Sequence, residues 1–377
     1  MIPFNKPFLT GTEAHYMYQA VYTGKLSGNG AFTQKCQHFF EEKYGFKKTL
    51  LTTSCTDALE MAAILCGVGP GDEVIVPSYT FVSSALAFVR QGCKIVFADS
   101  MEENPNVDAD KIEALITPHT KVIVPVHYAG VACDMDKIMD IAKRHNLLVV
   151  EDAAQAIDSY YKGRPLGTIG HLSAFSFHET KNIIAGEGGL LGINDERFIR
   201  RAEIIWEKGT NRSEFFRGEV NKYGWVDTGS SFLPSEVIAA FLWAQLENMD
   251  DIQQKRRVLW NAYYAGLQKL EEAGFVGLPY VPEYATNNAH MFYMVCRNLD
   301  ERTRLISFLK EHEILSVFHY LSLHKSDFYT SHNTFSPDLP NCDRYADCLV
   351  RLPMFYDLSL EQVNYIVENI KNYYRIV

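Results

Sequence analysis

The 377-residue sequence lacks three features, each of which would point to a particular class of protein. It has no basic excess, because 36 Lys and Arg residues stand against 46 Asp and Glu residues, for a formal charge of −10. That balance argues against nonspecific nucleic-acid binding, which needs a basic surface to neutralise phosphates. No apolar run approaches the ~18 residues of a membrane span. Residues 1–7 also lack the charged-then-apolar layout of a signal peptide.

Paired cysteines are also missing. The eight cysteines are scattered along the chain, and no two form a Cys-x-x-Cys pair. We therefore expect neither a disulfide framework nor a metal site, and we expect reduced thiols in a cytoplasmic protein. Hydrophobic residues make up 47% and charged residues 22%, which is the balance of an ordinary globular protein. The length suits about two domains.

Short β-rich runs alternate with helical stretches from residue 49 onward. Apolar strands of four to six residues separated by helices are typical of a mostly parallel sheet that is covered on both faces. The sequence therefore predicts an α/β fold for this part of the chain. The predicted strands are 49–53, 73–76, 94–98, 121–126, 147–151 and 172–177, and the predicted helices are 12–22, 31–44, 56–66, 80–91 and 135–145.

The pattern changes after residue 195. A helix at 195–208 and a polar loop at 209–231 precede a long helical stretch at 234–271. The remainder mixes strands with helices, which predicts a smaller α+β domain. We therefore expect a large domain over 1–233 and, over 234–377, a connecting helix with a small domain. The predicted elements of the small domain are strands 290–295 and 314–318 and helices 300–312 and 359–374.

Candidate functional residues lie just after the predicted strands, because open parallel sheets bind ligands at the carboxyl ends of their strands. Residues 53–57 (Thr-Ser-Cys-Thr-Asp) open a helix, where hydroxyl residues are either simple N-caps or part of an anion site. Residues 77–81 (Pro-Ser-Tyr-Thr-Phe) follow the next strand. An aromatic side chain there either stacks on a flat ligand or packs in the core.

Two further strand ends carry an acid and a lysine. Asp152 continues an apolar strand, and a buried carboxylate needs a partner because isolated buried charge is costly. The strand at 172–177 ends in a segment that contains Ser176, His178 and Lys181. Taken alone, Lys181 is typical of a solvated loop residue.

The four clusters together match the needs of one cofactor. Pyridoxal phosphate requires a phosphate-binding site, a side chain against its ring, a carboxylate for the protonated ring nitrogen and a lysine for the aldehyde. No single cluster is specific, but the ordered set predicts a pyridoxal phosphate enzyme.

The chain resembles, over nearly its whole length, the sugar-nucleotide aminotransferases of the DegT/DnrJ/EryC1/StrS family. That resemblance implies the fold of aspartate aminotransferase, known as fold type I. The stretches that carry it are residues 28–30 (Gly-Asn-Gly), 54–56, 70–73 (Pro-Gly-Asp-Glu), 77–81, 151–155 (Glu-Asp-Ala-Ala-Gln), 176–182 (Ser-Phe-His-Glu-Thr-Lys-Asn) and 186–189 (Gly-Glu-Gly-Gly).

The resemblance assigns roles to single residues. Lys181 would hold the cofactor covalently and Asp152 would pair with its ring nitrogen, so both are the predicted catalytic residues. Gln155 would bind the phenolic oxygen, and Phe81 would stack on the ring. The phosphate would bind Ser54, Cys55, Thr56 and Ser176.

One position departs from the family pattern. Many members have Gly-Tyr-Asn-Tyr-Arg where this chain has Gly-Ser-Ser-Phe-Leu at 229–233. In those relatives the asparagine reaches the phosphate in the neighbouring subunit, and Ser231 takes its place here. The resemblance thus implies a homodimer with shared sites, in which Ser231 would take the place of that asparagine.

Further stretches resemble the members that act on dTDP-4-keto-6-deoxyglucose. These are residues 125–133, 208–213, 216–218 and 288–293. The implied reaction moves the amino group of L-glutamate to the 4-keto carbon, yielding dTDP-4-amino-4,6-dideoxygalactose and 2-oxoglutarate for cell-surface polysaccharide synthesis. Substrate candidates from the resemblance and from loop positions are His127, Arg212, Arg217, His319 and His324.

Several alternatives stay open on sequence grounds. The same residues would serve the 4-amino gluco epimer, a 3-keto sugar or a noncatalytic relative that merely binds pyridoxal phosphate. Each substrate candidate could equally be a surface or packing residue. Related dehydratases replace the lysine with histidine, so Lys181 argues against that activity.

Overall fold

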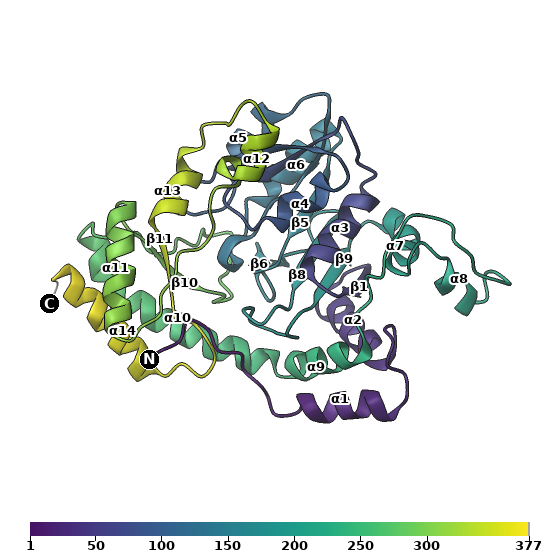
Figure 1. The fold of residues 1–377 in the computed structure, drawn as a ribbon, viewed down its shortest axis with the longest axis horizontal. Helices are drawn as coiled ribbons and strands as arrows, with labels where there is room; N and C mark the ends of the chain where they lie inside the picture. Colours follow the sequence, from purple (N-terminus) through teal and green to yellow (C-terminus); the bar gives the residue numbers. More distant parts are fainter. Residues whose placement is uncertain (376–377) are drawn as a thin grey trace.

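A computed structural model describes residues 1–375 of the chain. Its centre is a seven-stranded sheet with the strand order β1-β9-β8-β5-β4-β2-β3, flanked by helices (Figure 1). β8, β5, β4, β2 and β3 pair in parallel, whereas β9 is antiparallel to both β8 and β1. The strands are β1 (Lys48–Thr52), β2 (Glu73–Pro77), β3 (Lys94–Ala98), β4 (Thr120–Ile123), β5 (Leu148–Asp152), β8 (Leu172–Ser176) and β9 (Gly189–Ile193).

The mostly parallel sheet with flanking helices confirms the predicted fold class. Fourteen α-helices accompany it in the described part of the chain. They are α1 (Glu13–Tyr22), α2 (Ala31–Tyr44), α3 (Cys55–Leu65), α4 (Ser83–Val89), α5 (Ala109–Ile112), α6 (Met135–His145), α7 (Ile199–Trp206), α8 (Arg212–Phe216), α9 (Glu236–Glu247), α10 (Met249–Glu272), α11 (Leu299–Glu311), α12 (Asp327–His332), α13 (Pro340–Cys348) and α14 (Leu360–Tyr374).

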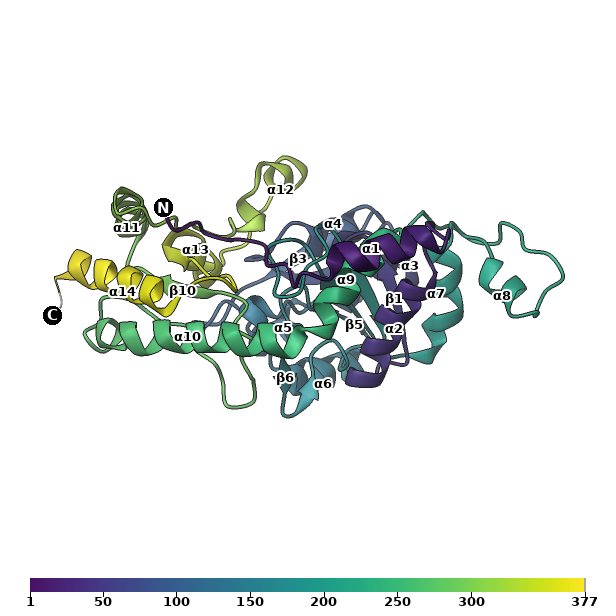
Figure 2. The ribbon, with the colours of Figure 1, turned by 90° about the horizontal axis from the view of Figure 1, so that it is seen from below.

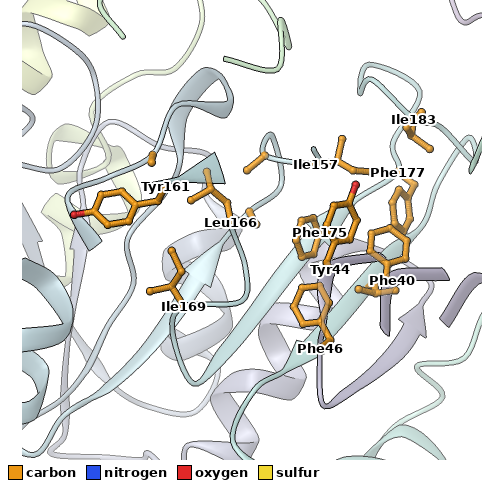
Figure 3. Packing of buried hydrophobic residues seen from close by; sticks show 14 of the residues in the cluster. Phe40, Tyr44, Phe46, Ile157, Tyr161, Leu166, Ile169, Phe175, Phe177 and Ile183 are labelled. Carbon is orange, nitrogen blue, oxygen red and sulfur yellow. The ribbon is translucent and has the colours of Figure 1, made fainter. Parts of the chain in front are cut away.

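Packing between α2 and β8 determines which side chains of β8 lie on the face of the sheet that α2 covers and which lie on the other face. The ring of Phe40 lies 5.9 Å from that of Phe175 and 5.8 Å from that of Phe177, in a buried aromatic cluster (Figure 3). Successive side chains of a strand point to opposite faces of the sheet. Because Phe175 and Phe177 are buried against α2, Ser176 between them is directed to the opposite face.

The reversed strand β9 was missing from the strands that the sequence predicted. β9 begins at Gly189, where a β-carbon would clash with the backbone of Ser54 and Cys55. Gly189 thus lets β9 approach the first turn of α3 closely. Two-stranded pairs complete the strands: β6 (Tyr160–Tyr161) with β7 (Arg164–Pro165), and β10 (Phe292–Val295) with β11 (Leu349–Leu352).

The predicted long helix over 234–271 is two helices. α9 ends at Glu247 and α10 begins at Met249, with Asn248 between them at φ −107° and ψ 13°. Apolar residues of α9 lie in the same core cluster as those of α2. α10 continues toward the C-terminal region and runs along it in Figure 2. The domain boundary at residue 233 stays a prediction.

The C-terminal region has a core of its own, built from α10, α11, α14 and the β10–β11 pair. α14 begins with a capping box between Ser359 and Gln362. The predicted strand over 314–318 is wrong, because Ile314 and Val317 form only isolated bridges, to Ile2 and Arg351. The N-terminal segment therefore lies against this region, as Figures 1 and 2 show.

The predicted loop over 209–231 contains a short helix, α8. In both views this segment projects from the body of the molecule (Figures 1 and 2). Its exposed aromatic residues include Phe216 and Trp225, and Trp225 is 85% exposed. No helix within residues 1–375 is both long and apolar enough to cross a membrane.

Candidate active site

A cavity of about 460 Å³ lies at the carboxyl ends of β5 and β8, beside the first turn of α3. It brings together nine of the predicted site residues from segments far apart in the sequence. They are Ser54, Cys55, Thr56, Phe81, Asp152, Gln155, Ser176, Lys181 and His319. The strand-end rule therefore located one site rather than scattered loop residues.

Asp152 ends β5 and is 5% exposed. Its Oδ2 accepts a 2.6 Å hydrogen bond from Ser84 Oγ, and its Oδ1 accepts a 3.1 Å bond from the amide of Ala154. Burial nevertheless raises the pKa of Asp152 above its ordinary value. An adjacent cation would favour the ionised carboxylate, so the site suits a protonated ring nitrogen.

Lys181 follows β8 in a tight turn, in which its amide donates a 2.9 Å hydrogen bond to the carbonyl of His178. Burial lowers the pKa of its side-chain amine to about 8, and the nearby charge of Arg351 acts in the same direction. A substantial fraction of the amine is therefore neutral near pH 8. A neutral amine is the form that attacks an aldehyde or accepts a proton.

The first turn of α3 forms the opposite end of the cavity. Ser54 is the N-cap, and its Oγ accepts a 3.1 Å hydrogen bond from the amide of Asp57. Cys55 and Thr56 are the first two residues of α3, before Asp57. Their amides lack acceptors within the helix, as is usual for the first turn of a helix. With the hydroxyls of Thr56 and Ser176 in the same cavity, this end suits a phosphate.

Two residues frame the space between these ends. Phe81 lines the cavity, and the residue is 56% exposed, so it presents an open aromatic face. Gln155 is held from both sides: its Oε1 accepts from the amide of Ala129 at 2.6 Å, and its Nε2 donates to Tyr320 Oη at 2.9 Å. The residues therefore fit pyridoxal phosphate, with a phosphate cradle, an aromatic wall, an acid and an amine in one cavity.

His127 does not line the cavity. Its ring is fully buried, with Nε2 2.9 Å from Glu151 Oε2, and its Nδ1 accepts a 3.2 Å bond from the amide of Cys133. Because that amide donates to Nδ1, the proton resides on Nε2 and is donated to Glu151. The structure thus places His127 in the support beneath the site.

Glu151 is fully buried next to Asp152 on β5. Besides His127, the amides of Gly167, Ile169 and Gly170 donate to its carboxylate at 2.8, 2.7 and 2.5 Å. Neighbouring residues of a strand point to opposite faces of the sheet. Glu151 therefore binds the 167–170 turn on one face, while Asp152 points into the cavity on the other.

Four other predicted residues also lie outside the cavity that contains Lys181. His324 is buried with its Nδ1 2.7 Å from Ser78 Oγ. Arg217 forms ion pairs with Glu203 at 2.8 Å and Glu219 at 2.7 Å. Ser231 and Arg212 line a second cavity of about 550 Å³. Within one subunit, therefore, none of these four side chains touches the predicted cofactor site.

His319 is the one predicted substrate residue that lines the cavity. Its Nδ1 lies 2.7 Å from Tyr128 Oη. Burial holds the pKa of His319 well below its ordinary value, and the positive charges of Arg351 and Lys181 lower it further. The ring is therefore a neutral hydrogen-bonding group at physiological pH.

The sequence did not single out several residues that line the cavity. Tyr320 and Arg351 were not named, and His290 appeared only within the 288–293 stretch that was quoted for the resemblance. Ser84, which bonds Asp152, was hidden inside an ordinary helical pattern. Only the fold brings His290 and Arg351 beside Lys181, because they are more than a hundred residues away in the chain.

The fold and the cavity together define the class: a pyridoxal phosphate-dependent enzyme of fold type I. The pattern of the DegT/DnrJ/EryC1/StrS aminotransferase family matches residues 9–371. The chain belongs to that family and is an aminotransferase of sugar substrates.

Individual relatives support this assignment over the full length. Spore coat polysaccharide biosynthesis protein SpsC of Bacillus subtilis is 32% identical, over 98% of this chain and 96% of SpsC. GDP-perosamine synthase of Escherichia coli O157:H7 is also 32% identical, over 99% of this chain and 98% of its own. Spr1654 of Streptococcus pneumoniae, solved with pyridoxamine phosphate, superposes with a TM-score of 0.91 at 27% identity, over 99% and 98% of the two chains. Spr1654 has also been solved in a pyridoxal phosphate form.

Proposed function

We propose that this chain transfers the amino group of L-glutamate to the 4-keto carbon of dTDP-4-keto-6-deoxy-D-glucose. The products would be dTDP-4-amino-4,6-dideoxy-D-galactose and 2-oxoglutarate. The observation that carries the transaminase chemistry is the meeting of Lys181 and Asp152 in one cavity with a helix N-terminus. The particular sugar rests on the sequence resemblance of residues 125–133, 208–213, 216–218 and 288–293.

The residues of the chain divide the chemical work. When bound, pyridoxal phosphate supplies the carbonyl that accepts the amino group and a ring that takes up carbanion charge. The Nζ of Lys181 removes the proton from the α-carbon of the donor and, in the second half-reaction, delivers a proton to C4 of the sugar. Asp152 keeps the ring nitrogen protonated. Tyr320 and His319 offer neutral hydrogen-bonding groups in the same cavity.

We further propose a cytoplasmic homodimer whose two sites are shared between subunits. Ser231 and Arg212 line a cavity separate from that of Lys181, so within one subunit they cannot act on the cofactor. In the dimer the cavity containing Ser231 would face the Lys181 cavity of the other subunit. The name of SpsC also accords with a role in cell-surface polysaccharide synthesis.

Product structure tests the proposed reaction. The enzyme would be incubated with dTDP-4-keto-6-deoxyglucose, L-glutamate and pyridoxal phosphate, and the sugar product examined by NMR. An axial amino group at C4 is expected. An equatorial amino group would identify the gluco epimer instead, and no amino sugar would remove this substrate; a 3-keto sugar would then be tried with the same assay.

A further inference from the structure

His290 is a buried histidine that is held at one ring nitrogen and at its backbone. The residue is 3% exposed, and its Nδ1 lies 2.9 Å from Oδ1 of Asn182. Its amide donates a 3.0 Å hydrogen bond to Oδ1 of Asn288. Its carbonyl accepts a 2.6 Å bond from the guanidinium of Arg256. The position of the ring is therefore fixed by three neighbours.

Asn182, the residue that follows Lys181, determines where the proton of His290 lies. Its Nδ2 donates one hydrogen to Oε1 of Gln253 at 2.7 Å and the other to the carbonyl of Asn288 at 2.9 Å. A backbone carbonyl only accepts, so the nitrogen of the Asn182 amide faces that carbonyl and Oδ1 faces the ring. Because Oδ1 is an acceptor, Nδ1 of His290 carries the proton and donates it.

The other ring nitrogen of His290, Nε2, therefore has a lone pair. A neutral imidazole carries one proton, so a ring that donates at Nδ1 accepts at Nε2. Burial holds the pKa of His290 well below its ordinary value. The positive charges of Lys181, Arg351 and Arg256 lower that pKa further. The ring is thus a neutral acceptor at neutral pH, and it lines the cavity that contains Lys181.

The amine of Lys181 is the donor that matches this acceptor. Within residues 1–375 neither Nζ of Lys181 nor Nε2 of His290 has a hydrogen-bond partner. Among the charges that act on His290, that of Lys181 is the strongest. The carboxylate of Asp152 is already bonded to Ser84 and to the amide of Ala154. Buried donors and acceptors are normally paired, so the two free nitrogens suit each other.

We propose that Nε2 of His290 accepts a hydrogen bond from Nζ of Lys181 when that amine is free, and so positions it for proton transfer. The inference rests on the proposed role of Lys181 as the proton carrier and does not depend on the identity of the sugar. With one N–H held by a fixed ring, the lone pair of the amine points in fewer directions, which favours a productive geometry. His290 is a positioning residue, because it acts through Lys181.

Two substitutions separate the acceptor from the bond that holds the ring. In H290N the side-chain amide reaches the position of Nδ1, so the bond with Asn182 is kept and the acceptor at Nε2 is lost. In H290Q the amide reaches the position of Nε2, so an oxygen still accepts from Lys181 while the bond with Asn182 is lost. A purely structural role makes H290N the milder change, whereas the proposed role makes H290Q the milder one.

The pKa of the Lys181 amine is the first measurement. It is obtained in the cofactor-free, full-length chain from the pH dependence of acetylation, with the exposed Lys137 as the reference in the same sample. A hydrogen bond that stabilises the charged amine raises its pKa. The pKa of Lys181 should therefore fall by about one pH unit in H290N. In H290Q it should stay at the wild-type value of about 8.

The pH dependence of kcat in the cofactor-loaded enzyme is the second measurement. Because proton transfer needs the neutral amine of Lys181, the acid limb of the profile should move to lower pH in H290N. The maximal kcat of H290N should fall roughly 10- to 100-fold, as expected for a misplaced base. H290Q should keep the wild-type acid limb and lose less.

The other groups around Lys181 are the same in both variants. Cys55 of α3, Asp152 of β5 and Arg351 of β11 act on the charge of its amine. The remaining titratable residues that line the cavity are His178, Glu187, His319 and Tyr320. A difference between H290N and H290Q therefore reports the atom that replaces Nε2.

His171 supplies the control and a spectroscopic reference. It is half-buried outside the cavity, and its Nδ1 accepts a 3.0 Å bond from the amide of Val149, so its proton lies on Nε2. H171N should leave the pKa of Lys181 unchanged. Nitrogen NMR of the histidine-labelled wild type should show His171 and His290 as opposite tautomers, with the resonances assigned by their loss in H171N and H290Q.

Three results would each overturn the inference. They are a proton on Nε2 of His290 in wild type, a pKa of Lys181 that is unchanged in H290N, and a pKa that falls equally in H290N and H290Q. If K181A keeps its transaminase activity, the proposed role of Lys181 is wrong, which is a separate result.

Discussion

The carboxylate of Asp152 has a demanding environment, because burial raises its pKa while its role requires the ionised form. D152N keeps the size of the side chain and removes the charge. We expect this variant to retain some bound cofactor and to lose transamination by on the order of 10²–10³-fold, as when one preorganised electrostatic group is removed from an active site. Rates measured at saturating pyridoxal phosphate check the prediction. A near-normal rate would contradict the pairing with the ring nitrogen.

The lowered pKa of Lys181 makes a prediction about stability. Its folded value of about 8 lies below the ordinary 10.5, so between these values the unfolded chain binds more protons than the folded one. The stability of cofactor-free wild type should therefore rise with pH across that window. K181M removes the buried amine, and its free energy of unfolding should exceed that of wild type by roughly 3 kcal/mol at pH 7. This gain should shrink toward about pH 10.

Urea unfolding of the cofactor-free proteins at neutral and alkaline pH measures this difference. Lys137 is the comparison residue, because it is exposed and its ion pair with Asp110 at 2.8 Å raises its pKa. K137M should show no such gain. If K181M is no more stable than wild type at pH 7, burial of Lys181 does not lower the pKa of its amine, and the prediction is contradicted.

Single residues could be predicted where chemistry and strand position coincide. Asp152 and Ser176 end their strands, Lys181 follows one, and all three are polar, so the topology of a parallel sheet predicted their meeting. His127, a candidate from the resemblance and from its loop position, lies outside the cavity, because such a position does not say which face a side chain takes, and this ring turns inward to Glu151. Arg351 has no local signal, since only the fold brings β11 to the cavity.

Helix α3 links local capping to cofactor binding at the scale of the element. S54A removes the N-cap bond to Asp57 and should cost about 1 kcal/mol of stability. It should also weaken binding of pyridoxal phosphate, because the capped first turn presents the amides of Cys55 and Thr56. Thermal melting and equilibrium dialysis of the cofactor measure the two effects.

Ser359 separates the two contributions. It caps α14 with the same type of bond, to the amide of Gln362 at 3.2 Å, in an element that does not line the cavity. S359A should therefore lose similar stability while its cofactor affinity stays that of wild type. Equal loss of affinity in both variants would mean that binding follows overall stability.

Helices and strands were predicted well where the spacing of apolar residues is regular. They were predicted poorly where contacts with distant parts of the chain determine the local structure. The break at Asn248 was invisible because Leu246 and Met249 continue the apolar pattern across it, and both are buried. β9 was missed because Gly189 and Gly192 weaken the strand pattern, since glycine is depleted in strands. These glycines are required by close neighbours, since a β-carbon at 192 would lie 2.6 Å from the ring of Phe46.

Subunit mixing tests the shared site at the scale of the whole molecule. K181A should be inactive and lack the visible absorbance of lysine-bound cofactor, and S231W should block the second cavity. If sites are shared across a twofold axis, mixed dimers carry one intact site, and the mixture should recover about a quarter of wild-type activity. The control mixes K181A with D152N, which both affect the same cavity, and should recover nothing. Failure of the first mixture to recover would contradict the shared site.

The buried position of Glu151 affects how mutational screens of this enzyme should be interpreted. Its carboxylate accepts bonds from His127 and from three amides of the 167–170 turn, all in the interior. Removing one partner from such a network typically destabilises a protein by several kcal/mol. An activity assay would therefore score residues 151 and 152 alike, although the loss at 151 comes from unfolding. Only a folding readout taken beside the activity, such as intrinsic fluorescence, tells the two neighbouring acids apart.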